Sequence, residues 1–122
     1  MLKLGATTFW EAYDTSIKGK DQYSFYDRPY GKSLCHGFSA GPAAFLPSEV
    51  LGLRPLEDGW KRFSVNPDLG NLKWVDASVP TPFGNIVIEI KNNTMTMNVP
   101  AGTTAEWKGM QIAGPKLITE KL

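Results

Sequence analysis

The hydrophobic pattern of this chain changes its period at Arg54-Pro55, and this change constrains the fold more than any other feature. Before it, apolar residues recur at helical spacing, at positions 43, 46, 50 and 53. After it, isoleucines at 86, 88 and 90 alternate with other residues, which is the period of a strand with one buried face. We therefore predict an α+β protein with two parts: short N-terminal helices in residues 1–53, then a small antiparallel β-sandwich in residues 54–122.

Several short strands are predicted in the second part. Residues 60–65 and 72–79 read as strands with a turn between them, and residues 103–107 would supply another. Alternation in residues 86–91 resumes at 95–99 after Asn92-Asn93, a pair that tolerates positive φ. These two segments are predicted to form a hairpin.

In the first part, residues 8–17 are predicted to start a helix, because Thr8-x-x-Glu11 fits a capping box. Residues 18–32 are polar and glycine-punctuated and read as a loop. A second helix is predicted from about Ser33 or Ser39 to Leu51, ending at Gly52; because of Pro47 it is expected to be kinked or divided into two short helices.

Two stretches of the first part combine ionisable residues with aromatics, glycines and small hydroxyl residues: Gly5-Ala-Thr-Thr-Phe-Trp-Glu11 and Ser33-Leu-Cys-His-Gly-Phe-Ser-Ala-Gly-Pro42. Glu11 has two interpretations. It could cap the helix by bonding back to the backbone of Thr8. Alternatively it could act as a general base between Trp10 and Tyr13, whose rings could pack on a sugar.

His36 also has two interpretations, as a hydrogen-bonded structural residue or as a ligand contact with open space beside Gly37 and Gly41. Cys35 is adjacent in sequence, but neighbouring residues on a helix diverge by about 100°, so a thiolate–imidazole pair is not expected. Cys35 is expected to be a small buried residue. One cysteine and one histidine cannot make a Cys/His zinc site, and we expect no metal or cofactor.

The formal net charge of +1 gives no electrostatic reason to expect nucleic acid or a membrane surface as a partner. No apolar run approaches the ~20 residues of a membrane span, and the N-terminus lacks the pattern of a secretory signal. The chain as given is therefore expected in the cytoplasm, although a longer parent protein could be exported.

Beyond these two stretches, further motifs follow in a fixed order: Phe45-Leu-Pro47, Val50-Leu-Gly-Leu-Arg-Pro55, Gly59-Trp-Lys-Arg-Phe63, Pro67-Asp-Leu-Gly70, Leu72-Lys-Trp74, Val79-Pro-Thr-Pro82 and Val99-Pro-Ala-Gly-Thr-Thr104. In this order and spacing the chain resembles the C-terminal end of bacterial α-L-rhamnosidases, glycoside hydrolase family 78. The resemblance extends to about residue 107, whereas residues 110–122 do not follow the expected family ending.

The resemblance implies the end of an (α/α)6 barrel followed by a C-terminal β-sandwich, and inverting hydrolysis of terminal α-L-rhamnosyl groups. By resemblance, Glu11 matches the general base that activates water, and His36 matches a histidine that contacts rhamnose. Trp10 is a further candidate for substrate binding. The general acid of the family lies upstream, in barrel segments that these residues do not include.

The sequence thus predicts a C-terminal fragment or short relative of such a hydrolase that is inactive alone. Its expected partners are a rhamnose-containing carbohydrate and either a second copy or a separately encoded barrel portion. The alternative function is a non-catalytic carbohydrate-binding module, or an interaction module. In the carbohydrate-binding case, faces of Trp60, Trp74 or Trp107 could stack on a sugar.

Overall fold

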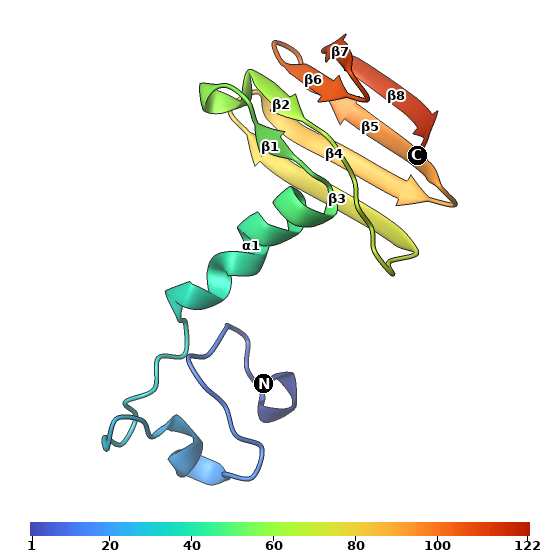
Figure 1. The fold of residues 1–122 in the computed structure, drawn as a ribbon. Helices are drawn as coiled ribbons and strands as arrows, with labels where there is room; N and C mark the ends of the chain where they lie inside the picture. The colour runs from blue at the N-terminus through green and yellow to red at the C-terminus, as the bar shows by residue number, and fades with distance from the viewer. The chain divides into compact units, whose positions relative to one another are not determined.

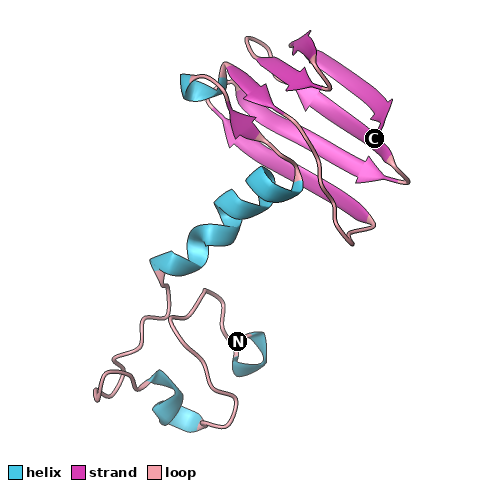
Figure 2. Ribbon diagram, viewed as in Figure 1, coloured by secondary structure: helices cyan, strands magenta, loops and turns pink.

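The computed structural model describes all 122 residues, and the chain forms two compact units, Met1–Ala43 and Ala44–Leu122. The first unit consists of loops and short turns, and the second holds all the strands (Figures 1 and 2). An α+β chain that ends in a small β-sandwich, as predicted, is confirmed. No helix in the chain is both long and apolar enough to cross a membrane.

The helix predicted over residues 8–17 does not form. Before Gly41, where a short α-helix begins, the first unit contains only 3-10 turns, at Leu2–Leu4, Gly19–Tyr23 and Gly37–Ala40. Eight of the ten residues in this segment, all except Glu11 and Ala12, are weaker helix formers than alanine or leucine. A helix of ten such residues is marginal by itself. Instead, the Glu11 N–H donates to the Ser33 carbonyl, the Phe9 carbonyl accepts from the His36 N–H, and the Trp10 N–H donates to the Met1 sulfur.

The second predicted helix is present and changes its winding along its length. The 3-10 turn Gly37–Ala40 leads into α1, Gly41–Phe45, and then into a π-helical turn, Leu46–Val50. Pro47 lies in this last turn, where its missing N–H removes a backbone donor, and the backbone N–H of Leu53 donates to the Pro47 carbonyl at 3.0 Å. The helical stretch ends at Gly52, with φ +56°, as predicted.

The strands of the second unit form two four-stranded sheets. One sheet has the order β1-β2-β6-β7 and the other β3-β4-β5-β8. Their bounds are β1 Arg54–Pro55, β2 Arg62–Ser64, β3 Trp74–Thr81, β4 Gly84–Lys91, β5 Thr94–Val99, β6 Thr104–Trp107, β7 Met110–Ala113 and β8 Lys116–Lys121. The predicted hairpin is β4–β5, and both of its turn residues have positive φ, +50° at Asn92 and +59° at Asn93.

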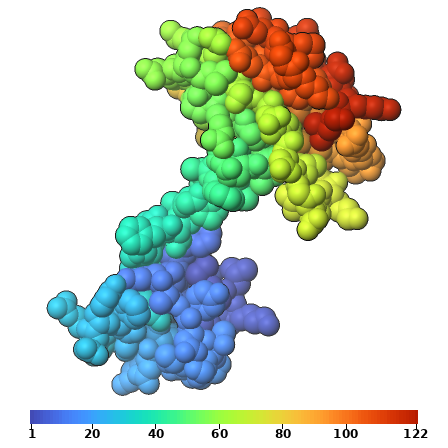
Figure 3. Space-filling view, viewed as in Figure 1, coloured from blue at the N-terminus to red at the C-terminus, as the bar shows by residue number.

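One strand pair departs from the antiparallel pattern. β2 and β6 run parallel, with Phe63 opposite Ala105. Parallel neighbours need a long crossover connection, and here the crossover is the other sheet's β3, β4 and β5. In the space-filling view, the green β1–β2 region lies directly against the orange β6–β7 region (Figure 3).

The core of the second unit lies between the two sheets, as alternate residues of both turn inward. In β4, Ile86, Ile88 and Ile90 are buried while the residues between them are exposed. The other buried core residues are Leu51, Leu53, Phe63, Val65, Met95, Met97, Val99, Ala105, Trp107 and Ile112. Residues 110–122, which the sequence left without a role, supply β7 and β8 and complete one edge of each sheet.

Candidate functional site

The two sequence stretches that carry the candidate residues lie side by side in the first unit. The backbone N–H of Glu11 donates to the Ser33 carbonyl at 2.9 Å, and that of His36 donates to the Phe9 carbonyl at 2.9 Å. The Thr8 hydroxyl donates to the Leu34 carbonyl. These hydrogen bonds hold the segments that carry Glu11 and His36 next to each other in one small unit.

The Glu11 carboxylate is held at both oxygens. The Tyr26 hydroxyl donates to Oε1 at 2.5 Å, and the Ser33 backbone N–H donates to Oε2 at 3.1 Å. Both bonds favour the ionised form, so they hold the pKa of Glu11 below its usual value, the Tyr26 bond most strongly. Partial burial opposes this lowering of the pKa, while His36 and Lys32 add smaller lowering effects through their charge.

The helix-cap interpretation of Glu11 is therefore wrong. Neither Thr8 nor Glu11 begins a helix. The Thr8 hydroxyl bonds to the Leu34 carbonyl, and the Glu11 carboxylate accepts from the Ser33 N–H, so the two residues do not cap each other. The carboxylate still accepts one backbone hydrogen bond, but from a residue 22 positions away in the chain. Tyr26 and the Ser33 amide are the residues that sequence reasoning did not assign to this site, because no local pattern links them to Glu11.

Trp10 is buried, with an exposed fraction of 8%. The edge of its ring meets Tyr23 at a centroid distance of 5.8 Å, and Tyr23 in turn stacks on Tyr30 at 6.2 Å. Within this unit the indole of Trp10 thus packs inside an aromatic cluster that fixes the loop carrying Tyr26.

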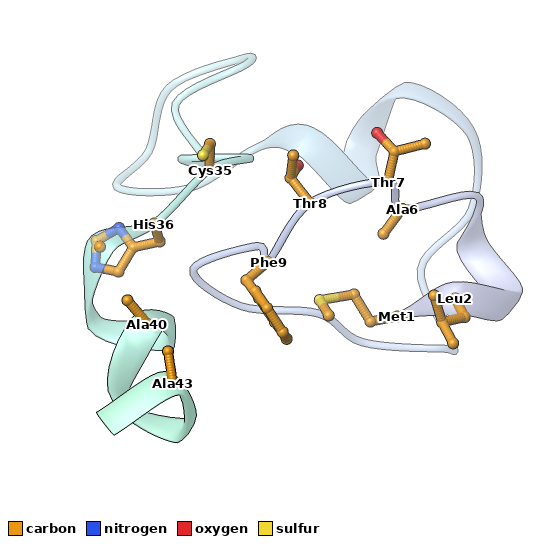
Figure 4. Close-up of a pocket in the computed structure, with 11 residues that line it drawn as sticks. Met1, Leu2, Ala6, Thr7, Thr8, Phe9, Cys35, His36, Ala40 and Ala43 are labelled. Atoms are coloured by element: carbon orange, nitrogen blue, oxygen red, sulfur yellow. The ribbon is translucent and has the colours of Figure 1, made fainter. Parts of the chain in front are cut away.

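His36 is half-buried and lines a pocket of about 680 Å³ whose walls are mostly apolar. Figure 4 shows Met1 and Phe9 beside one another on one side of this pocket, with Ala40 and Ala43 on the helical segment across from them. The other lining residues are Leu2, Ala6, Thr7, Thr8, Cys35 and Gly37. Glu11 and Trp10 do not line the pocket, so the structure gives the histidine and the glutamate different surroundings.

The Cys35 thiol is exposed at this pocket, which corrects the expectation of a buried small residue. The segment that carries it is a bend outside the helical stretch, which begins only at Gly37. The His36 ring packs instead against the Phe38 ring, edge to face, at 4.8 Å. No group of three or more His, Cys, Asp or Glu side chains in the chain is arranged to hold a metal ion.

The arrangement favours one kind of chemistry. An ionised carboxylate with one donor on each oxygen keeps further lone pairs for a water molecule, since a carboxylate has about four acceptor positions. The lowered pKa of Glu11 keeps its carboxylate in the ionised state that a general base needs, while it reduces the strength of that base.

The second unit belongs to the class of small two-sheet β-sandwich domains. Residues 52–108 match a known family, the bacterial alpha-L-rhamnosidase C-terminal domain. The resemblance of this chain to the C-terminal part of bacterial α-L-rhamnosidases is thereby confirmed. No curated protein sequence matches the chain.

Two solved structures show the same fold. The chain aligns with the Streptomyces avermitilis α-L-rhamnosidase, determined in complex with L-rhamnose, at a TM-score of 0.64 and 22% identity, over 85% of this chain and 10% of that one. It aligns with the native α-L-rhamnosidase from Aspergillus terreus at a TM-score of 0.69 and 20% identity, over 98% of this chain and 15% of that one. The 122 residues thus span a small share of the length of either enzyme.

Proposed function

We propose that this chain supplies the C-terminal part of an inverting α-L-rhamnosidase-like glycoside hydrolase, with Glu11 as the general base. The observation that carries the proposal is the Glu11 carboxylate, held ionised by Tyr26 and Ser33 in a unit that precedes a rhamnosidase-type C-terminal domain. In this role Glu11 takes a proton from water as the water attacks C1 of the sugar, while a general acid protonates the leaving oxygen on the opposite face.

His36 is proposed as a rhamnose contact. Its ring lines the apolar pocket, where a methyl-bearing sugar such as rhamnose could place its apolar side against Phe9 and Ala40, with the imidazole bonding to a hydroxyl. Trp10 remains a prediction as a substrate contact. Because its ring is covered by Tyr23, we expect its effect on the sugar to pass through the position of the neighbouring Glu11.

The general acid of this reaction is proposed to lie outside the 122 residues. This part of the proposal rests on the resemblance: in the family, the acid that stands about 6.5–9.5 Å from the base comes from barrel segments upstream of the matched residues. The chain alone is therefore expected to release no nitrophenol from an aryl α-L-rhamnoside. If the purified chain releases nitrophenol, and Glu11→Gln abolishes that release, the expectation that the chain is inactive alone is wrong.

The base role itself is tested by restoring the rest of the enzyme. The chain is fused behind the Streptomyces avermitilis enzyme from which the structurally equivalent C-terminal segment has been removed. We expect the fusion to hydrolyse aryl α-L-rhamnoside and Glu11→Gln to lower its kcat on the order of 10²–10⁴-fold. Glu49 is a surface carboxylate paired with Arg54, and the matched control Glu49→Gln should leave kcat unchanged. A fusion no more active than the truncated enzyme alone would contradict the proposal.

The partner of the first unit is proposed to be a barrel portion of this kind. Large apolar side chains there are exposed, with exposed fractions of 92% for Phe38, 82% for Leu2 and 55% for Phe9. Contiguous apolar surface usually marks an interface. Sedimentation velocity of the chain with and without the barrel portion tests this, and a chain that stays monomeric and unbound at all concentrations would count against it.

A second candidate function, a non-catalytic carbohydrate-binding surface, is favoured by one residue. Of the three tryptophans considered for stacking, Trp107 is buried in the core and Trp60 packs partly against it, whereas Trp74 is 65% exposed. Trp74 begins the edge strand β3, opposite Lys91, and the next cross-strand pair on the same face of the sheet is Asp76 with Glu89. An exposed indole beside carboxylate acceptors is a suitable surface for a pyranose ring.

Tryptophan fluorescence titrated with L-rhamnose and with rhamnose-containing oligosaccharides tests this surface. The candidate predicts a saturable change that Trp74→Ala removes and that Leu72→Ala, an exposed neighbour without an aromatic ring, leaves intact. A sugar response unchanged in Trp74→Ala would exclude this surface.

A further inference from the structure

Tyr26 is the strongest single contact of the Glu11 carboxylate, and it comes from a loop to which the sequence gave no functional role. Its hydroxyl lies 2.5 Å from Oε1, within the range of strong hydrogen bonds to a charged acceptor. The bond joins residues fifteen positions apart in the chain. It is therefore set by the fold of the loop and not by local sequence.

The backbone at Tyr26 is in a conformation that tyrosine rarely adopts. Phe25 and Arg28 exchange two backbone hydrogen bonds, of 3.1 Å and 3.0 Å, around a two-residue turn. Both central residues have positive φ, +52° at Tyr26 and +55° at Asp27. A turn of this kind favours Asn, Asp or Gly at both positions, and left-handed backbone is unfavourable for a residue such as tyrosine.

A bulky residue at a strained position is best explained by what its side chain does. The turn directs the phenol to Glu11, and the Tyr26 ring packs edge to face on Phe25 at 4.4 Å. The loop is fastened on the far side by Lys32, whose backbone N–H donates to the Tyr23 carbonyl at 3.0 Å and whose ammonium donates to the Gln22 carbonyl. Tyr23 stacks on Tyr30 next to Trp10. The turn that carries Tyr26 is thus held in place by hydrogen bonds from Lys32 and by aromatic packing.

We propose that Tyr26 is the positioning residue for Glu11, orienting the carboxylate through the Oη–Oε1 hydrogen bond. The inference rests on the proposed base role of Glu11 for its meaning in catalysis. Because the hydroxyl bonds to one oxygen and the Ser33 amide to the other, the carboxylate plane is fixed and the remaining lone pairs are directed away from both donors.

The groups that face the carboxylate besides Tyr26 and Ser33 are His36 and Lys32, and both favour its ionised form. The same hydrogen bond acts on the donor in the opposite sense. It raises the pKa of the Tyr26 phenol, because deprotonation would break the bond and place two negative charges together.

The test compares Tyr26→Phe with Tyr30→Phe. The two tyrosines are matched, since both are about equally exposed, at 69% and 70%, and both have positive φ, but only Tyr26 bonds to Glu11. The pKa of the Glu11 carboxyl is followed by carbon-13 NMR of the chain as it stands. We expect Tyr26→Phe to raise that pKa and Tyr30→Phe to leave it unchanged.

Two further measurements keep the inference separate from the proposed function. Ultraviolet titration should show one phenol that ionises late and that Glu11→Gln returns to the ordinary range. Tyr26→Asn, which suits the left-handed turn better, should leave the unit folded and yet raise the pKa of Glu11. In the active fusion, Tyr26→Phe should move the acidic limb of the kcat profile to higher pH.

An unchanged Glu11 pKa in folded Tyr26→Phe would overturn the positioning role, whatever the catalytic result. A raised pKa with no change in the pH profile of the fusion would uphold the contact and count against Glu11 as the base.

Discussion

Ser33 and Glu11 bond to each other in both directions. The Glu11 backbone N–H donates to the Ser33 carbonyl at 2.9 Å, and the Ser33 backbone N–H donates to the Glu11 side chain at 3.1 Å. This reciprocal pair joins the two sequence stretches that carry the candidate residues. It also gives the Glu11 N–H an acceptor; at the start of a helix over residues 8–17, this N–H would have needed a capping side chain.

Acid should weaken this link in a defined direction. Because the pKa of Glu11 is lowered in the folded chain, its ionised form contributes stability above the unfolded pKa, and that contribution is lost as pH falls through the folded pKa. We predict that the Ser33 amide proton resonance titrates with a midpoint below the ~4.3 of an ordinary glutamate. Glu11→Gln should abolish that titration. A midpoint at or above the ordinary value would contradict the hydrogen bond between the Ser33 amide and the Glu11 carboxylate.

Gly52 should be irreplaceable at the end of the helical stretch. Its φ is +56°, and a Cβ placed there would lie 2.3 Å from the Asn66 carbonyl oxygen. We expect Gly52→Ala to lower the free energy of unfolding by more than the roughly 1–2 kcal/mol that left-handed backbone alone costs. Gly109→Ala is the control, with φ +76° and open space, and should show only the conformational cost in urea unfolding. Equal losses in the two variants would contradict the close approach.

Neighbouring residues of β4 should differ sharply in their contribution to stability. Ile88 is buried between the sheets, whereas Val87 is 39% exposed on the outer face. Ile88→Ala is expected to cost about 2–5 kcal/mol through lost burial and a cavity, and Val87→Ala less than about 1 kcal/mol. Urea denaturation of both variants measures the difference, and similar midpoints would mean that the register of β4 is wrong.

The last strand should be needed for the sandwich. β8 pairs with β5 along its whole length, with Met97 opposite Ile118, and Ile118 packs against the core. A chain shortened to end at Ala113 would leave the β5 edge unpaired, so we expect a lower urea midpoint and concentration-dependent aggregation. An unchanged midpoint would show that the tail is dispensable.

The parts of the fold that local chemistry sets were predictable from the sequence. Alternating isoleucines indicated β4, Asn92-Asn93 marked its turn, and Gly52 marked the helix end. The parallel pairing of β2 with β6 was not predictable, because it depends on a crossover through the other sheet. The helix over residues 8–17 was predicted wrongly, since the competing partner, residues 33–36, is distant in sequence.

The candidate site follows the same division. The residue types around Glu11 and His36 indicated a site, and the ordered resemblance indicated its family. The Tyr26 contact depends on a turn in left-handed backbone, and such a turn in Phe-Tyr-Asp-Arg has no Asn-Gly signal to reveal it.

The central claim is that Glu11 activates water, and azide rescue tests it most directly. Azide attacks C1 without losing a proton, so it needs no general base. In the fusion with the truncated Streptomyces avermitilis enzyme, Glu11→Ala should lose hydrolysis of aryl α-L-rhamnoside. Added azide should then restore nitrophenol release and yield the rhamnosyl azide of inverted configuration. A folded Glu11→Ala variant that azide fails to restore, or one that still hydrolyses at the rate of the unmutated fusion, would contradict the assignment of Glu11 as the base.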